Sequence, residues 1–331
     1  MRVPWRTAMT AALYGPDGFF VSGGGPGAHF RTSANASPLL GTALLRLLER
    51  VDTALGHPDP LHVVDVGAGR GELLTVLAAG AAPRLHHRLR LTAVELAPRP
   101  ESLPAAIEWR DRLPSGVTGL LIATEWLDNV PLDVAESSLT GWRYLTVDPA
   151  TASEAPGEPV TDADADWLAR WWPATPGGRA EIGLPRDLAW AAAVRALDRG
   201  LALAVDYGHL RDARPHGGTL TGFHAGRQVP PVPDGTCDIT AHVAVDAVAA
   251  AGSAAAGRPY VLVPQRKALA ALGVDATRPP LADATTDPAG YVRALAAASA
   301  AAELLDPTGL GGHWWLLQPV GLSPAVAELS R

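Results

Sequence analysis

A run of glycines after an apolar segment constrains the fold of this 331-residue chain more than any other feature. Residues 61–66 are apolar and rich in valine, a pattern typical of a buried parallel strand. Gly67, Gly69 and Gly71 follow at alternate positions, and residues 72–79 have the composition of a helix. Strand, glycine turn and helix together predict a pocket at the carboxyl end of the strand, where backbone N–H groups and the helix dipole meet a polar ligand.

Acidic residues around this loop narrow the class of ligand. Asp65 stands two residues before the first glycine, and a second apolar segment, 89–94, ends in Glu95. An acid at the end of the neighbouring strand is placed to accept hydrogen bonds from a ribose. The D-x-G-x-G-x-G spacing departs from the dinucleotide fingerprint and resembles that of class I S-adenosylmethionine-dependent methyltransferases. The competing interpretation is a βα turn without a ligand.

We therefore expect S-adenosylmethionine as the cofactor. Asp111, after a strand predicted at 107–110, lies where many class I enzymes place an acid that faces the adenine amino group. The expected cofactor-binding residues are Asp65, Gly67, Ala68, Gly69, Gly71, Glu95 and Asp111.

Candidate catalytic residues follow other expected strands. Glu125 and Asp128 lie beyond the strand predicted at 119–123, and they share one face if the turn there is helical. In a doubly wound sheet this end faces the reacting group, so both are candidate catalytic residues. Asp206 is a weaker candidate, and His242, on a segment expected to open a helix, is a candidate base. The competing interpretations are an acidic helix cap and a structural histidine.

Composition excludes several other classes of protein. A net charge of −7 gives no overall attraction for a phosphate backbone, so we expect no nucleic-acid partner. Cys237 is the single cysteine, which excludes an intrachain disulfide and a cysteine zinc cluster and is typical of a reducing compartment. The alanine-rich tract 294–302 is much shorter than the ~20 apolar residues of a membrane span. We therefore expect a cytoplasmic protein with no signal peptide, membrane span or metal site.

Several separate blocks of sequence occur in an order that resembles the MidA-type methyltransferases. This family includes relatives of the mitochondrial respiratory complex I assembly methyltransferase. The matching blocks cover most of the chain: Tyr14–Phe20, Phe30–Gly41, Asp65–Gly71, Glu125–Pro131, Pro176–Ile182, Asp206–Gly208, Gly218–Leu220 and Asp238–Val243.

The resemblance implies an α/β fold. Its parts are a Rossmann-like class I methyltransferase core with a mainly parallel seven-stranded sheet, an N-terminal cap, and an insertion over the cleft. Residues 1–55 would form the cap or lid with a helix, and residues 56–331 the methyltransferase domain, with a substrate-side insertion at about 132–186. Within that insertion, the proline-rich and acidic stretch 149–166 is expected to be irregular.

The resemblance also implies protein arginine N-methylation, with a respiratory complex I subunit as the protein substrate. A guanidinium has a pKa above about 12, so carboxylates must hold it bidentately and draw charge from the attacking nitrogen. Glu125 is the first choice for this clamp, with Asp128 in support. The family usually has an acid where this chain has His29, Glu where it has Asn35, and Asn where it has Thr124.

Two other functions stay open. One is a small-molecule O- or N-methyltransferase, with Glu125 or His242 as general base. The other is a protein that binds S-adenosylmethionine and assists assembly without turnover.

Overall fold

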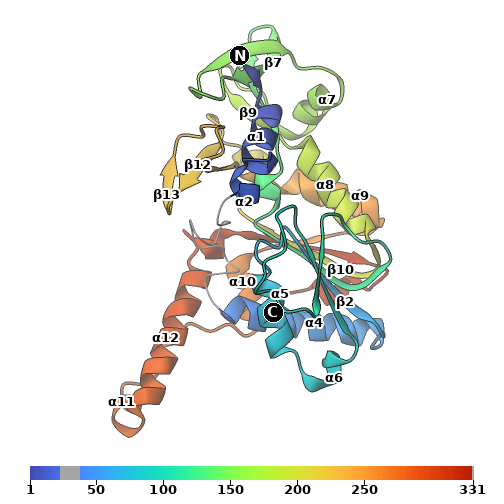
Figure 1. Ribbon diagram of the computed structural model, residues 1–331, viewed down its shortest axis with the longest axis vertical. Helices are drawn as coiled ribbons and strands as arrows, with labels where there is room; N and C mark the ends of the chain where they lie inside the picture. The colour runs from blue at the N-terminus through green and yellow to red at the C-terminus, as the bar shows by residue number, and fades with distance from the viewer. Residues whose placement is uncertain (23–37, 330–331) are drawn as a thin grey trace.

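A seven-stranded sheet forms the centre of the lower part of the molecule (Figure 1). The computed structural model describes residues 1–22 and 38–329. From one edge to the other the strands are β16 (Val261–Pro264), β17 (Trp314–Val320), β10 (Leu197–Asp206), β5 (Val117–Thr124), β2 (Leu61–Val66), β3 (Leu89–Val94) and β4 (Ile107–Arg110). The central strands are apolar along their length because helices cover both faces of the sheet.

The direction of β17 differs from that of its neighbours. β10, β5, β2, β3 and β4 pair in parallel, whereas β17 is antiparallel to both β10 and β16. The sheet is therefore mixed, and the expected mainly parallel arrangement holds from β10 to β4. A 3-10 turn at Leu310–Gly312 leads into β17 at the carboxyl edge of the parallel strands, so β17 has to run back across the sheet.

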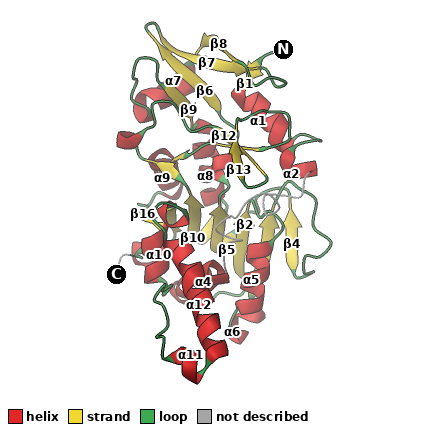
Figure 2. Cartoon of the chain, turned by 90° about the vertical axis from the view of Figure 1, so that its left-hand side faces the viewer, coloured by secondary structure: helices red, strands yellow, loops and turns green. Residues whose placement is uncertain are grey.

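Helices pack on both faces of the sheet (Figure 2). On one face, α4 (Pro38–Leu55), α5 (Glu72–Gly80), α10 (Gln265–Ala271) and the end of α12 (Pro288–Leu305) contribute to one apolar core. On the other face, α8 (Leu184–Arg195) and α9 (Val245–Ala256) pack together. In α4 the apolar residues recur at helical spacing and form the face that packs against the core: Leu40, Leu44, Leu47, Leu48 and Val51.

A second sheet lies above the first in Figure 1. Its strands are β1 (Val3–Pro4), β6 (Asp133–Ser138), β7 (Gly141–Val147), β8 (Glu154–Pro159) and β9 (Arg179–Ile182). α1 (Trp5–Tyr14) packs against it through Trp5, Met9 and Leu13, and α7 (Asp162–Trp171) through Trp167. The stretch 149–166 was expected to be irregular. This prediction is wrong, because β8 and the start of α7 lie within it.

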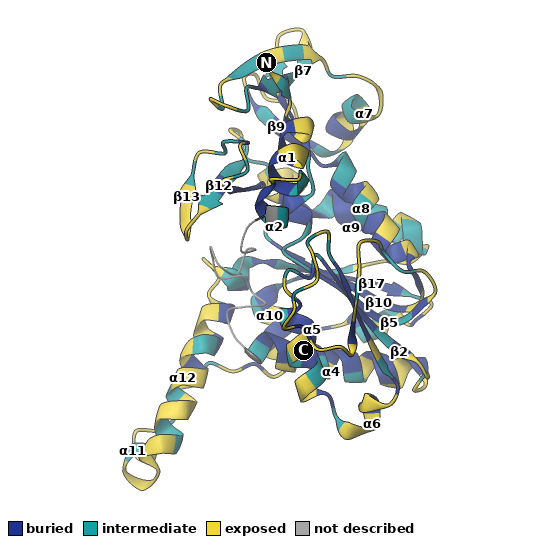
Figure 3. Ribbon diagram, in the orientation of Figure 1, coloured by how far each residue is buried: buried dark blue, intermediate teal, exposed yellow. Residues whose placement is uncertain are grey.

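Several short elements complete the fold. They are α2 (Phe19–Ser22), α6 (Pro83–His86), β11 (Gly208–His209), β12 (Thr221–His224), β13 (Arg227–Val229), β14 (Asp238–Thr240), β15 (Val243–Ala244) and α11 (Asp283–Thr286). β13, β12 and β14 form a three-stranded sheet, and β11 pairs with β15. α11 and the start of α12 project from the body and are largely exposed (Figure 3). None of the described helices is both long enough and apolar enough to cross a membrane.

Candidate active site

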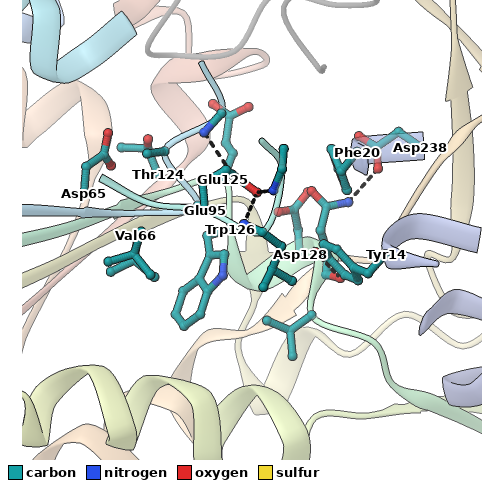
Figure 4. Close-up of a pocket in the computed structure, with 18 of the residues that line it drawn as sticks. Tyr14, Phe20, Asp65, Val66, Glu95, Thr124, Glu125, Trp126, Asp128 and Asp238 are labelled. Carbon is teal, nitrogen blue, oxygen red and sulfur yellow. Dashed lines mark hydrogen bonds between the residues drawn. The ribbon is translucent and has the colours of Figure 1, made fainter. Parts of the chain in front are cut away.

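One cavity of about 980 Å³ lies beyond the carboxyl ends of β2, β3 and β5. Figure 4 shows its two ends: Asp65 and Thr124 lie at one end, and Tyr14 and Asp238 at the other. Glu125 lies between them. The cavity is within the size range of small-molecule sites in proteins, which is about 300–1,000 Å³.

The glycine loop forms the wall at the first end. Gly67 and Gly71 have φ of +71° and +80°, in the left-handed region that residues with a Cβ rarely adopt. A Cβ on Gly67 would lie 2.7 Å from Cδ1 of Trp126, and one on Gly71 would lie 2.5 Å from Cδ1 of Leu103. The turn therefore favours glycine at both positions, and at Gly67 the close packing against Trp126 favours it as well.

Glu95 ties the end of β3 to this loop. Its Oε2 accepts a hydrogen bond of 3.0 Å from Gly69 N, and its Oε1 accepts bonds of 2.7 and 3.1 Å from Leu96 N and Ala97 N. Burial raises the pKa of Glu95, and these three amides oppose that shift. Asp111 lines the same end of the cavity as an exposed side chain.

Asp65 is a buried acid at the loop end of the cavity. Its side chain is on β2, the residue is 2% exposed, and its Oδ1 has no hydrogen-bond partner among the described residues. Burial raises the pKa of Asp65 to about 8, with repulsion from Glu95 and Glu72 adding to the shift. A buried polar atom without a partner is costly unless a ligand or solvent satisfies it. The carboxyl is therefore suited to a bound cation or hydrogen-bond donor.

Glu125 has an unusual backbone conformation at the middle of the cavity. Its φ is +48°, and its N–H donates a 2.8 Å hydrogen bond to Val205 O on β10. A left-handed conformation costs a residue with a Cβ roughly 1–2 kcal/mol, and such residues cluster at functional sites. The carboxyl is 10% exposed, and its Oε1 lies 3.9 Å from Nδ1 of His313.

Asp128 lies close to Glu125 in sequence but does not share a helical face with it. The turn is a 3-10 turn from Leu127 to Asn129, and Glu125 precedes it. Asp128 is 3% exposed, and its Oδ2 accepts hydrogen bonds from the hydroxyls of Tyr207 and Thr240. The condition under which the two carboxylates would share a helical face is therefore not met, although Asp128 still lines the cavity.

Asp206, at the end of β10, accepts hydrogen bonds from the backbone of the same turn. Its Oδ2 accepts bonds of 3.0 and 3.2 Å from Leu127 N and Asp128 N, and its Oδ1 accepts one of 3.0 Å from Tyr207 N. Burial, and then the charges of Asp128 and Glu125, raise the pKa of Asp206 well above its usual value. Asp206 therefore shapes the turn that carries Asp128.

His242 is not in the helix expected for it, because α9 begins at Val245 and His242 precedes β15. Its ring is exposed and lies edge-on to Tyr207, with ring centroids 5.1 Å apart. The part of the imidazole that faces Tyr207 is shielded from solvent, and this desolvation lowers the pKa of His242. His242 is not one of the described residues that line the cavity.

Two buried residues were missed by the sequence analysis. The guanidinium of Arg186 donates to the carbonyl oxygens of Asp128, Val130, Ala241 and His242. It thereby holds together the segments that flank the cavity. His313 lines the cavity beside Glu125 and comes from the far end of the chain. Neither residue lies in a recognisable motif, so there was no reason to predict from the sequence that either lies at the cavity.

Comparison with known proteins decides the family. The family model described as "Putative S-adenosyl-L-methionine-dependent methyltransferase" matches residues 39–262. The chain belongs to this family. The glycine loop, Glu95 and Glu125 all lie within the matched region. A comparison with curated proteins gives no match.

Two solved structures share the fold of this methyltransferase over nearly its whole length. One is a Burkholderia thailandensis protein crystallised with S-adenosyl-homocysteine bound. It is 26% identical, has a TM-score of 0.79, and the match covers 97% of this chain and 89% of that one. The other is an uncharacterized protein of the same superfamily and organism, 25% identical, with a TM-score of 0.77 and coverage of 97% and 88%.

The cavity fits the family's cofactor. S-adenosylmethionine carries a sulfonium and an ammonium group, and the unpartnered Oδ1 of Asp65 offers an acid at the loop end. Among the positions where the chain departs from the MidA-type pattern, Thr124 lines the cavity. His29 and Asn35 lie outside the described residues.

Proposed function

We propose that this methyltransferase transfers a methyl group to an arginine side chain of a protein, and that the protein is a respiratory complex I subunit. The MidA-type resemblance suggests this substrate. The observation that carries the proposal is the position of Glu125, between the cofactor end and the aromatic end of the cavity (Figure 4).

The cofactor would be held at the loop end of the cavity. Gly67, Ala68, Gly69 and Gly71 would let the backbone approach it closely, and Glu95 would accept hydrogen bonds from its ribose hydroxyls. Asp65 would face its positive charge, and Asp111 its adenine. When bound, S-adenosylmethionine supplies an activated methyl group, so the protein has mainly to align the acceptor with it.

The acceptor would enter from the other end. Tyr14 and Phe20 stack there with ring centroids 5.5 Å apart, beside the buried acids Asp128 and Asp238. Aromatic faces and acids together favour a planar cation such as guanidinium. Glu125 would clamp that cation and draw positive charge away from the attacking nitrogen, with Asp128 supporting the wall and His242 near its rim.

Among the described N-terminal residues, Arg6, Thr10, Tyr14 and Phe20 line the cavity, which supports the proposed N-terminal cap. We propose that this cap contacts the acceptor. We also propose that the insertion at about 132–186 lies on the substrate side of the cavity, where Pro185 is one of the described lining residues.

Glu125→Gln tests the clamp. The variant keeps the size and hydrogen bonding of the side chain but loses its charge, so transfer to arginine should fall by at least 100-fold while the Kd for S-adenosylmethionine changes less than twofold. The measurements are calorimetric Kd and label transfer to the complex I subunit. Glu49→Gln, at a half-buried position on α4 where the carboxylate pairs with Arg84 and does not line the cavity, is the matched control.

Three outcomes separate the functions. If the wild-type protein methylates arginine and Glu125→Gln does so at the same rate, the clamp is refuted. A variant that loses activity but partly recovers at high pH would indicate a hydroxyl or amine acceptor, because such an acceptor can ionise without help whereas arginine cannot below about pH 12. Wild-type protein that binds the cofactor and labels neither protein nor small molecule in a cell lysate would refute turnover.

A further inference from the structure

The antiparallel direction of β17 brings a second polar side chain to the reacting edge of the sheet. Trp314 at the start of β17 pairs with Asp206 at the end of β10. The residue before β17, His313, therefore lies at the edge where the parallel strands β5 and β10 end. This is the edge that carries Glu125 and Tyr207.

The position of His313 is fixed by a network behind the cavity wall. Its carbonyl oxygen accepts a 2.7 Å hydrogen bond from Gln265 N. The Gln265 side chain donates to Leu310 O at 2.9 Å and accepts from Trp315 Nε1 at 3.0 Å. Gln265 is itself fully buried at the start of α10. The loop that presents His313 is thus held on both sides of the histidine.

The side chain of His313 faces Glu125 across a narrow gap. Its Nδ1 lies 3.9 Å from Glu125 Oε1, and both side chains are 10% exposed. The Tyr207 ring lies on another side, with its centroid 5.5 Å from that of the imidazole. His313 and Glu125 both line the cavity, so an acceptor that reaches Glu125 also reaches the imidazole.

The imidazole is neutral in this environment. Burial, with repulsion from His242, lowers the pKa of His313 to about 4. Within the described parts of the chain, the titratable groups that face it are Glu125, Tyr207 and His242, from the ends of β5 and β10 and from the segment before β15. At pH 7 one of its ring nitrogens can therefore accept a proton.

We propose that His313 is a second catalytic residue of this methyltransferase, which accepts the proton that the acceptor loses on methylation, while Glu125 stabilises the imidazolium. The choice of nitrogen as acceptor rests on the proposed function. The acceptor nitrogen bonds to the methyl carbon, and the electron pair of the methyl–sulfur bond stays on sulfur as S-adenosyl-homocysteine. The nitrogen then releases one proton to His313, which passes it to solvent.

His313→Gln tests the proton transfer. The single-turnover rate of transfer to the complex I subunit should fall 100- to 10,000-fold, while the Kd for S-adenosylmethionine changes less than twofold. His62→Gln is the control. It makes the same substitution near the start of β2, at the opposite end of the parallel strands from the cavity, and should keep the wild-type rate. A His313→Gln rate within threefold of wild type would overturn the proposal.

Chemical rescue separates a base from a merely structural residue. His313→Ala should recover activity when imidazole is added, and imidazoles of higher pKa should give faster rates. A structural defect would not respond to the basicity of the additive. Loss of activity in folded His313→Ala with no response to any imidazole would therefore contradict the role as base.

An acceptor-free measurement tests the pair itself. In protein with 13C-labelled histidine, the His313 resonance is identified by its absence in His313→Gln and then followed down to pH 4.5. With a pKa of about 4, about a quarter of the rings are protonated there. Glu125→Gln removes a carboxylate 3.9 Å from Nδ1, so it should lower the pKa of His313 and reduce the protonated fraction. An unchanged value would overturn the pairing, whereas a wild type that ignores the complex I subunit would refute only the arginine substrate.

Discussion

Binding of S-adenosylmethionine should expel a proton from Asp65. The residue is buried beside the glycine loop, and burial together with Glu95 and Glu72 raises its pKa to about 8. At pH 7 about 90% of the carboxyls are then protonated. A cation within hydrogen-bond reach lowers the pKa of a carboxyl by about 1–3 units, so the bound cofactor should favour the ionised form.

The size of the effect follows from this shift. If the cofactor lowers the pKa to about 5.5, binding at pH 7 releases about 0.9 proton, and the Kd rises roughly five- to tenfold between pH 7 and pH 6. Calorimetry at pH 7 in buffers of different ionisation enthalpy measures the released proton as the slope of the observed heat. In Asp65→Asn the side chain cannot titrate, and the slope should fall to near zero.

The same substitution should change the stability of the protein without cofactor. A raised carboxyl pKa favours folding fully below pH 3.8, and this contribution is lost as pH rises toward 8, because the unfolded chain ionises first. At pH 7 the loss is at most about 4 kcal/mol, which Asp65→Asn should recover in part. Binding heats independent of buffer, together with a Kd unchanged between pH 6 and pH 7, would refute this account of Asp65.

Two further predictions concern the loop and a buried histidine. Gly67→Ala places a Cβ 2.7 Å from Trp126 and should raise the calorimetric Kd for S-adenosylmethionine at least tenfold. Gly116→Ala is the control: Gly116 also has a positive φ, but the added Cβ would lie 3.7 Å from its nearest neighbour, and the Kd should not change. Burial, with Arg214, lowers the pKa of His209 to about 3, so its contribution to stability should fall by about 3 kcal/mol between pH 7 and pH 4 as the unfolded chain takes up a proton. His209→Gln should flatten that part of the pH dependence in chemical denaturation, and an unchanged acid limb would contradict it.

The central strands could be predicted because their sequence reports their environment. Residues 61–66 and 89–94 are apolar runs, and they form β2 and β3 with those bounds. β8 could not be predicted in this way. It pairs with β7 through its backbone, contains Pro156 and Pro159, and is partly exposed, so its side chains show no alternation that would indicate a strand.

The residues of the cavity divide in a similar way. The glycine loop and Glu95 belong to one strand–turn–helix unit and its neighbour, where spacing along the chain translates directly into proximity. His313 reaches Glu125 through the antiparallel entry of β17, and no local pattern before Trp314 indicates that direction. If β17 ran parallel to β10, it would start at the opposite ends of these strands, away from the cofactor loop.

Some polar residues of the sequence blocks position the backbone and others are candidates for catalysis, and their hydrogen bonds distinguish the two roles. The Glu181 carboxylate accepts hydrogen bonds from the backbone N–H groups of Thr219 and Leu220, so it joins two of the sequence blocks. Asp206 likewise accepts from backbone amides of the turn at Leu127–Asn129. Substituting such a residue would misplace the wall and reduce activity without any part in the chemistry. Low activity alone therefore cannot identify a catalytic residue here. For His313 the deciding result is the dependence of rescue on imidazole basicity, which a displaced wall does not produce.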